Sequence, residues 1–377
     1  MNSPSKLFQP IDVGDLPLKH RVVLAPLTRF RAHKDHVLNS HALTYYAQRA
    51  STPGTLLITE ATFISQKAGG FDHVPGIYTE EQIEAWKSIV SAVHAKGSFI
   101  FMQLWALGRA ADVSVLKREN NSPHVSSSSI PLTGHTNTPR SLTIPEIEEY
   151  VQDYVLAAKN AVNLAGFDGV EIHGANGYLI DQFLQNVSNN RTDGYGGSVQ
   201  DRAKFALEVV RAVSNAVGAS RTAIRLSPWS PFQDMGMSDP VPTYSYLVRE
   251  LCMYDLAYLH VIEPRVGGAW DCDGAPSQSN QFIRDIWGRR TYISAGGYTR
   301  QTALNAAEKG GLIAFGRLFI SNPDLPLRLL KDISLTPADI PKHYQPGNLT
   351  PSGYTDWPFT EGGGVEHQRL PPSSTGI

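Results

Sequence analysis

Short runs of apolar and β-branched residues recur along the chain, each bounded by glycine, proline or polar residues. Runs of this length and composition predict buried β-strands. Eight such strands are expected, at residues 21–25, 55–59, 98–102, 167–173, 222–226, 258–262, 292–295 and 312–315.

Between these runs the pattern changes to the spacing of amphipathic helices. Thr79 with Gln82, and Thr143 with Glu146, each match a capping box, so helices are predicted to begin just after Thr79 and Thr143. Five apolar side chains then fall on one face of the first of these helices: Ile83, Trp86, Ile89, Val90 and Val93. Further helices are expected over residues 41–50, 198–217, 244–253 and 299–309.

Strand and helix patterns that mostly alternate imply right-handed crossovers between parallel strands, and eight of them close into a barrel. A (β/α)8 TIM barrel takes about 250 residues, whereas the chain has 377. The remainder is expected to form a hairpin within residues 7–19, a long loop after the third strand and a C-terminal tail. The predicted fold is therefore one α/β domain over residues 1–377, a (β/α)8 TIM barrel.

The long loop, residues 107–142, is rich in serine, threonine, asparagine and proline. Four consecutive serines, at residues 126–129, give it a locally simple composition. Both a disordered segment and a structured lid fit this composition, since long loops in compact domains are often functional.

Composition narrows the class of protein. Hydrophobic residues are 41% and charged residues 18%, which is typical of a globular chain. The net charge is −2 and the basic residues are scattered along the sequence, so nucleic acid is not an expected partner. No run is apolar enough to cross a membrane, and the first residues lack the core of a signal peptide, so a soluble cytoplasmic protein is expected. Two cysteines are too few for a disulfide framework or an iron–sulfur cluster.

Polar residues and glycines gather where the predicted strands end, and in such barrels the chemistry lies at those ends. Buried Gln103, His173 and Arg225 are costly unless they are paired, so three of them together favour a ligand site over a satisfied polar core. Gly296-Gly297 and Gly316-Arg317 follow the last two strands, where barrels commonly hold a phosphate on backbone N–H groups. A phosphorylated cofactor is therefore predicted.

The end of the fourth strand and the turn after it carry three polar side chains, His173, Asn176 and Tyr178, with glycines at 174 and 177. An imidazole and an amide at this spacing can both donate to one oxygen atom. A phenol is protonated at neutral pH and can serve as a proton donor. A polar turn that only satisfies its own backbone is the alternative.

In sequence order, these motifs resemble the old yellow enzymes, a family of flavin-dependent ene-reductases, and specifically the branch of fungal secondary metabolism. The resemblance covers almost the whole chain. The motifs are Ala25-Pro26-Leu27-Thr28-Arg29, Ile58-Thr59-Glu60-Ala61, Gln103-Leu104-Trp105, residues 169–178, Asn190-Arg191-Thr192-Asp193, Tyr195-Gly196-Gly197-Ser198, Arg225-Leu226-Ser227-Pro228 and Phe315-Gly316-Arg317.

The resemblance implies a tightly bound, non-covalent FMN, with NADPH or NADH as the reductant. The residues it implies around the flavin are Pro26, Leu27, Thr28, Ala61, Gln103, His173, Arg225, Gly296, Gly297, Gly316 and Arg317. His173 and Asn176 would bind the carbonyl oxygen of an enone or enal, and Tyr178 would protonate the α-carbon. Tyr354 is expected to line the substrate pocket, with a packing role as the alternative.

Two other functions are compatible with the same residues. One is a redox-neutral isomerase or cyclase of natural-product biosynthesis, and the other is a flavin-binding protein without catalysis. The expected partner is a small molecule, and the chain is expected to be a monomer or a homodimer.

Overall fold

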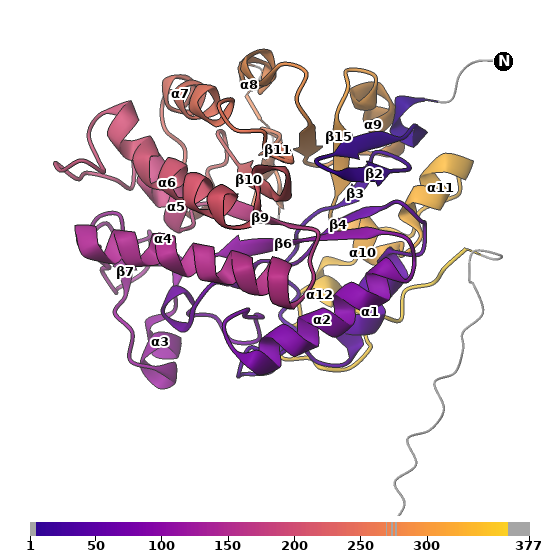
Figure 1. The fold of residues 1–377 in the computed structure, drawn as a ribbon, viewed down its shortest axis with the longest axis horizontal. Coiled ribbons are helices and arrows are strands. Elements are labelled where there is room, and N and C mark those ends of the chain that lie inside the picture. Colours follow the sequence, from indigo (N-terminus) through magenta and orange to yellow (C-terminus); the bar gives the residue numbers. More distant parts are fainter. Residues whose placement is uncertain (1–4, 269, 273, 276, 361–377) are drawn as a thin grey trace, which may run out of the picture.

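The computed structural model describes residues 5–268, 270–272, 274–275 and 277–360. Within them, eight parallel strands form a closed barrel surrounded by helices (Figure 1). The barrel strands are β3 (Val22–Leu24), β4 (Leu56–Ile58), β6 (Phe99–Trp105), β9 (Gly169–Gly174), β10 (Thr222–Leu226), β11 (Tyr258–Ile262), β14 (Tyr292–Ala295) and β15 (Leu312–Phe315). Their order is β4-β3-β15-β14-β11-β10-β9-β6, and pairing of β4 with β6 closes the ring. The predicted TIM barrel is confirmed, and β10, β11, β14 and β15 have the predicted bounds.

The barrel interior changes from apolar to polar along the strands. Val23, Ile58 and Phe101 belong to one buried cluster inside the barrel. Because side chains alternate along a strand, Gln103 points to the same side of β6 as Phe101, one pleat nearer the carboxyl end. Glu171 is paired with Gln103 across β6 and β9, so the polar layer continues onto the next strand. This layer lies between the apolar part of the interior and the loops that follow the strands.

Helices cover the outside of the barrel, and α4 and α6 lie side by side on it (Figure 1). The helices are α1 (His41–Arg49), α2 (Glu80–His94), α3 (Val113–Glu119), α4 (Ile144–Lys159), α5 (Leu179–Leu184), α6 (Val199–Val217), α7 (Val241–Leu251), α8 (Gln281–Trp287), α9 (Arg300–Ala307), α10 (Arg317–Ser321), α11 (Leu325–Lys331) and α12 (Ile340–His343). Both predicted capping boxes are formed, at Thr79 with Gln82 and at Thr143 with Glu146. They satisfy N–H groups that would otherwise be free at the start of α2 and α4.

The predicted N-terminal hairpin is formed by β1 (Ile11–Val13) and β2 (Leu16–Leu18), which pair antiparallel. Val13 and Leu18 are buried in the same cluster as Val23 and Phe101. The hairpin therefore covers the amino-terminal end of the barrel and leaves the carboxyl end for the site.

The long loop after β6 is folded in the structure, as the lid alternative predicted. It contains α3, and β7 (Val125–Ser126) pairs with β8 (Arg140–Ser141). Ser126 and Ser127 are fully buried, and the Ser127 hydroxyl donates to the carbonyl oxygens of Gln182 and Ser188, both at 2.8 Å. The small hydroxyl side chains therefore fasten the loop to the segment that follows β9.

Some elements were not predicted from the sequence. They include β5 (Thr62–Phe63), the antiparallel pair β12 (Val266–Gly267) and β13 (Trp270–Asp271), and helices α5, α8, α10, α11 and α12. Short 3-10 turns at Lys6–Phe8, Gln66–Ala68, Gly108–Ala110, Ala219–Arg221 and Phe232–Asp234, and a π turn at Asn160–Leu164, complete the described part. Among the described helices, none combines the length and the apolar character that crossing a bilayer requires.

Candidate active site

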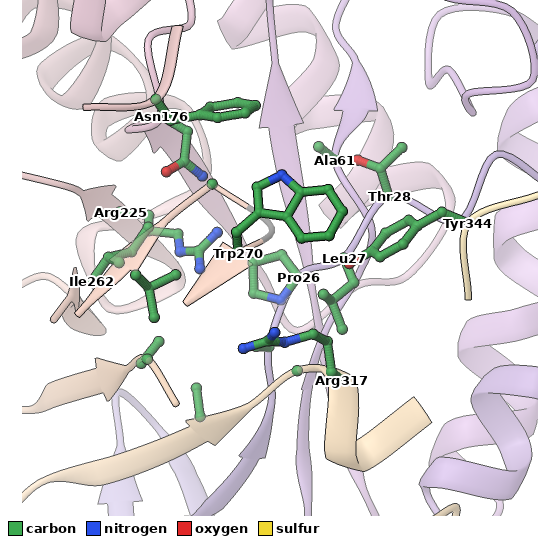
Figure 2. A pocket seen from close by; sticks show the side chains of 18 of the residues that line it. Pro26, Leu27, Thr28, Ala61, Asn176, Arg225, Ile262, Trp270, Arg317 and Tyr344 are labelled. Atoms are coloured by element: carbon green, nitrogen blue, oxygen red, sulfur yellow. The ribbon is translucent and has the colours of Figure 1, made fainter. Parts of the chain in front are cut away.

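A cavity of about 1030 Å³ lies at the carboxyl ends of the barrel strands. Residues at the ends of all eight strands, or in the loops that follow them, contribute to its wall. In Figure 2, Asn176 and Arg225 lie across the cavity from Thr28 and Tyr344. The cavity brings together all but one of the residues predicted for the site: Pro26, Leu27, Thr28, Ala61, Gln103, His173, Asn176, Tyr178, Arg225, Gly296, Gly297, Gly316 and Arg317.

Several buried polar atoms at this cavity have no hydrogen-bond partner among the described residues. They include His173 Nδ1, Asn176 Oδ1 and Arg225 Nε. A buried polar atom without a partner is costly, so such atoms mark the places where a ligand completes the hydrogen bonding. The three atoms come from β9, β10 and the turn after β9, which are neighbours in the barrel. The cavity therefore fits a ligand with polar ring edges, such as a flavin.

The turn after β9 is held in a conformation that few residues adopt. Asn176 and Gly177 have φ values of 58° and 73°, in the left-handed region. A Cβ at Gly177 would lie 2.8 Å from the Cβ of Gln233, so only glycine fits there. The Gly177 N–H donates to the buried carboxylate of Asp181 at 2.8 Å, and the Asn176 N–H donates to Ser227 Oγ at 2.8 Å. The turn thus fixes the Asn176 side chain at the edge of the cavity.

His173 and Tyr178 are in contact at the cavity wall. Their ring centroids are 5.0 Å apart, and Tyr178 also packs edge-on against Trp105 at 4.7 Å. Burial and the nearby charge of Arg225 lower the pKa of His173 well below its usual value, so its imidazole is neutral. Burial also raises the pKa of Tyr178, so its phenol keeps its proton. The pair therefore offers a neutral imidazole beside a protonated phenol.

The two glycine-containing turns lie at another side of the cavity, near Arg317. Gly296 and Gly297 have φ values of 138° and 56°, which L side chains rarely adopt. A Cβ at Gly316 would lie 3.2 Å from the side chain of Leu27, which also lines the cavity. Glycines at these positions leave bare backbone on the cavity wall, and Arg317 adds a cation there. This is the chemistry that a phosphate needs.

Aromatic residues that sequence reasoning missed form much of the remaining wall. They are Phe30, Phe71, Trp105, Phe232, Trp270, Tyr298 and Tyr344. Trp270 comes from the β12–β13 hairpin and is 60% exposed, which is unusual for a tryptophan. Its position between glycine-rich and polar residues after the sixth barrel strand was the one signal in the sequence for a loop that covers the site.

The structure places Tyr354 away from the cavity, which corrects the expectation that it lines the substrate pocket. Tyr354 is fully buried and stacks on Tyr45 with ring centroids 4.5 Å apart. The Arg29 guanidinium donates to the carbonyl oxygen of Gly353 at 2.9 Å and so holds this part of the tail inward. Tyr344, ten residues earlier, points into the cavity in its place (Figure 2).

The chain is similar to known proteins along most of its length. Residues 6–336 match the model of the NADH:flavin oxidoreductase / NADH oxidase family. The chain is 50% identical to chanoclavine-I aldehyde reductase fgaOx3 of Penicillium roqueforti, covering 94% of this chain and 97% of that protein. It is 48% identical to the NADP-dependent oxidoreductase lnbE of Aspergillus flavus, covering 95% and 97%.

A solved structure extends the similarity to the fold. The old yellow enzyme from Pichia superposes with a TM-score of 0.87 and 40% sequence identity, over 94% of each chain. The chain therefore belongs to the old yellow enzyme family, in its fungal secondary-metabolism branch, and is an FMN-dependent oxidoreductase that uses NAD(P)H to reduce activated carbon–carbon double bonds.

Proposed function

We propose that FMN is held in this cavity by the residues that the sequence singled out, and that the chain acts as one domain. The flavin contacts would come from Pro26, Leu27, Thr28, Ala61, Gln103, His173, Arg225, Gly296, Gly297, Gly316 and Arg317. Support comes from their common position on one cavity and from the unpartnered atom Arg225 Nε. The glycine turns with Arg317 suit the phosphate, and Gln103 with Arg225 suits the polar edge of the ring.

The bound FMN supplies the hydride chemistry. We propose that His173 and Asn176 donate hydrogen bonds to the carbonyl oxygen of the substrate, where negative charge develops as the β-carbon receives hydride. Tyr178 then gives its proton to the α-carbon. One hydride and one proton add across the double bond, and one NAD(P)H is oxidised. The observation that carries this proposal is the buried, unpartnered Nδ1 of His173, which lies on one cavity wall with the Asn176 amide and the protonated Tyr178.

The substrate class we propose is an α,β-unsaturated aldehyde with a large apolar body. The name of the Penicillium relative, an aldehyde reductase, supports the aldehyde carbonyl. Trp270, Phe232 and Phe71 on the cavity wall support the apolar body, because aromatic side chains bind flat apolar surfaces well. The name of the Aspergillus relative, an NADP-dependent oxidoreductase, supports NADPH as the reductant.

A redox-neutral isomerase is not favoured. Both relatives described above are named as a reductase or an oxidoreductase. Tyr178 also lies in the cavity, where an isomerase that only lends and recovers hydride has less need of a proton donor.

The test is a pair of stopped-flow measurements on the flavin-loaded enzyme. NADPH and NADH are compared as reductants by the loss of flavin absorbance, and the reduced enzyme is then mixed with an enal, an enone or the matching saturated aldehyde. We expect faster reduction by NADPH, rapid reoxidation by the unsaturated compounds only, and a product two hydrogens heavier with its carbonyl group intact. An alcohol product, or a product of unchanged mass, would contradict the proposal.

A further inference from the structure

A carboxylate, Glu171, lies inside the barrel behind the cavity wall. Its Oε1 accepts a hydrogen bond from Gln103 Nε2 at 2.7 Å, and its Oε2 accepts one from His260 Nδ1 at 2.8 Å. The side chains of Glu171 and His260 are both fully buried. Gln103 is paired with Glu171 across β6 and β9, and Arg225 is paired with His260 across β10 and β11. The four polar side chains therefore span four adjacent strands.

Stability alone does not explain a charge at this position. The rest of the interior is filled by residues such as Val23, Ile58 and Phe101. Replacing a buried ion pair by apolar residues of similar volume is often neutral or stabilising. A carboxylate here is therefore expected to act on the residues it contacts, and of these Gln103 lies on the cavity wall.

The charge state of the group follows from its neighbours. Burial by itself would raise the pKa of Glu171, but the hydrogen bonds donated by His260 and Gln103, together with the charge of Arg225, hold it below its usual value. Burial lowers the pKa of His260, and its Nε2 has no partner among the described residues, so we assign a neutral imidazole protonated on Nδ1. Glu171 is thus a negative charge near Arg225, one of the cations on the cavity wall.

The hydrogen bond to Glu171 also decides which way the Gln103 amide points. A carboxylate only accepts hydrogen bonds, so Gln103 must turn its NH₂ group towards Glu171. Its Oε1 then faces away from Glu171 and is free to accept a hydrogen bond at the cavity. Without Glu171 the amide has two nearly equivalent orientations, and only one of them presents an acceptor to the ligand.

We propose that Glu171 is a positioning residue for the flavin: it fixes the amide of Gln103 and offsets the charge of Arg225, and so limits how strongly the site favours the reduced cofactor. The proposal rests on the proposed flavin contacts of Gln103 and Arg225. His260 supports Glu171 from the far side and has no contact with the ligand in this scheme.

The test uses the flavin-loaded enzyme and two readouts other than turnover, the midpoint potential of the bound flavin and the Kd for FMN. Glu171→Gln keeps the volume and removes the charge, so Arg225 is left uncompensated. The reduced flavin, which carries more negative charge, should be favoured about tenfold or more, equivalent to a rise of about 30 mV for a two-electron couple. FMN should also bind more weakly, because Gln103 loses its fixed orientation.

Two further variants separate the effect of the Glu171 charge from the effects of packing and of the contact with Gln103. Phe101→Leu loosens the same interior without changing its charge, and should leave the equilibrium between oxidised and reduced flavin within about twofold of wild type. Glu171→Asp keeps the charge but draws the carboxylate back from Gln103, so FMN affinity should fall while the potential stays near wild type. This variant carries the test if Glu171→Gln does not fold.

The outcomes separate this proposal from the proposed function. An unchanged potential in folded Glu171→Gln, or wild-type FMN affinity in Glu171→Asp, would reduce Glu171 to a packing residue. If instead the Gln103→Ala substitution leaves the FMN affinity at the wild-type value, the proposed flavin contacts are contradicted.

Discussion

The ring of Tyr354 lies on the ring of Tyr45, with centroids 4.5 Å apart and an angle of 12° between the planes. The Arg29 guanidinium lies 4.9 Å from the centre of the Tyr45 ring, and the Arg49 guanidinium lies 3.7 Å from it. Cations over aromatic faces are stabilised when both are removed from water. The stack therefore fastens the C-terminal segment to α1, and this segment carries Tyr344 to the cavity.

Substituting the two tail tyrosines should separate stability from catalysis. Tyr354→Ala empties a fully buried site and should lower the free energy of unfolding by about 3 kcal/mol or more. Tyr344→Ala removes a half-buried residue of the cavity wall, so we expect a severalfold change in KM for the enal and a much smaller loss of stability. Thermal unfolding and steady-state kinetics of both variants give the comparison. A large change in KM from Tyr354→Ala with unchanged stability would mean that Tyr354 lines the substrate pocket.

Glu60 should make the stability of the protein depend on pH. It is buried just after strand β4, where its Oε2 accepts from the Arg29 backbone N–H at 3.1 Å and its Oε1 accepts from the Tyr46 hydroxyl at 3.4 Å. Burial raises the pKa of Glu60 to about 7 in spite of these donors. A carboxyl whose folded pKa is raised contributes stability that is present below its unfolded pKa and is lost as pH rises through the folded value.

Glu60→Gln should therefore remove part of the fall in stability between pH 5 and pH 8, a part worth about 3 kcal/mol. Denaturant unfolding at several pH values measures it. Glu149→Gln, at a largely exposed carboxyl, is the control and should keep the wild-type slope. Parallel slopes for wild type and Glu60→Gln would mean that the folded pKa of Glu60 is not raised.

The sequence was sufficient for the framework of the fold because the relevant signals are local. Strands β10, β11, β14 and β15 are short, mostly apolar runs with clear ends, and their bounds were predicted correctly. The starts of α2 and α4 were set by Thr79 and Thr143, whose capping boxes involve residues only three positions apart. The residues at the strand ends then follow from the fold, since parallel strands present their carboxyl ends on one side.

What the sequence did not settle depends on distant contacts. Ser126 and Ser127 look like a simple polar tract, yet both are buried. The Ser126 hydroxyl donates to the side-chain oxygen of Gln182, and the Ser127 hydroxyl donates to its carbonyl oxygen. Whether Tyr344 or Tyr354 reaches the cavity likewise depends on distant contacts, because Arg29 donates hydrogen bonds to carbonyl oxygens of the tail beside each of them. Neither local composition nor spacing records such partners.

Arg225→Ala should leave a protein that binds FMN poorly or holds a flavin that is hard to reduce. The guanidinium is buried at the cavity, and a hydrogen bond to a charged group contributes enough that its loss should weaken FMN binding about tenfold or more. The measurement is the FMN content after reconstitution, followed by titration with NADPH. Arg202→Ala is the matched control, because Arg202 is as deeply buried but bonds Leu184 O and Thr243 Oγ1, outside the cavity wall. Equal FMN loss in both variants would indicate general unfolding.

His173→Ala combined with Asn176→Ala should abolish the binding of phenols to the oxidised enzyme. The proposed donors face the place where negative charge develops, so they should favour a phenolate oxygen, and stacking on the flavin should give a long-wavelength charge-transfer band. Titration of wild type and the double variant with a simple phenol measures that band, while flavin content is checked separately. A band of unchanged strength in the double variant would place the carbonyl site elsewhere in the cavity.

Tyr178→Phe tests the proton donor itself. The substitution removes one hydroxyl and keeps the ring, which packs edge-on against Trp105 and His173, so fold and flavin content should be preserved. Reduction of the flavin by NADPH needs no proton from this position and should keep its rate. Reoxidation by an enone does need one, and a positioned general acid contributes about 10²–10⁴-fold, so this half-reaction should slow by that factor.

The two half-reactions are measured separately by stopped flow, with oxygen as a control oxidant that should reoxidise the flavin of the variant as it does in wild type. A non-activated enone is the right probe, because a more acidic product can take its proton from water and hide the loss. If both half-reactions keep their wild-type rates, the buried phenol of Tyr178 is a packing group and the proton has another source. If the variant instead forms a product of unchanged mass faster than wild type, hydride is being returned to the cofactor. The hypothesis of a redox-neutral isomerase then replaces that of a reductase.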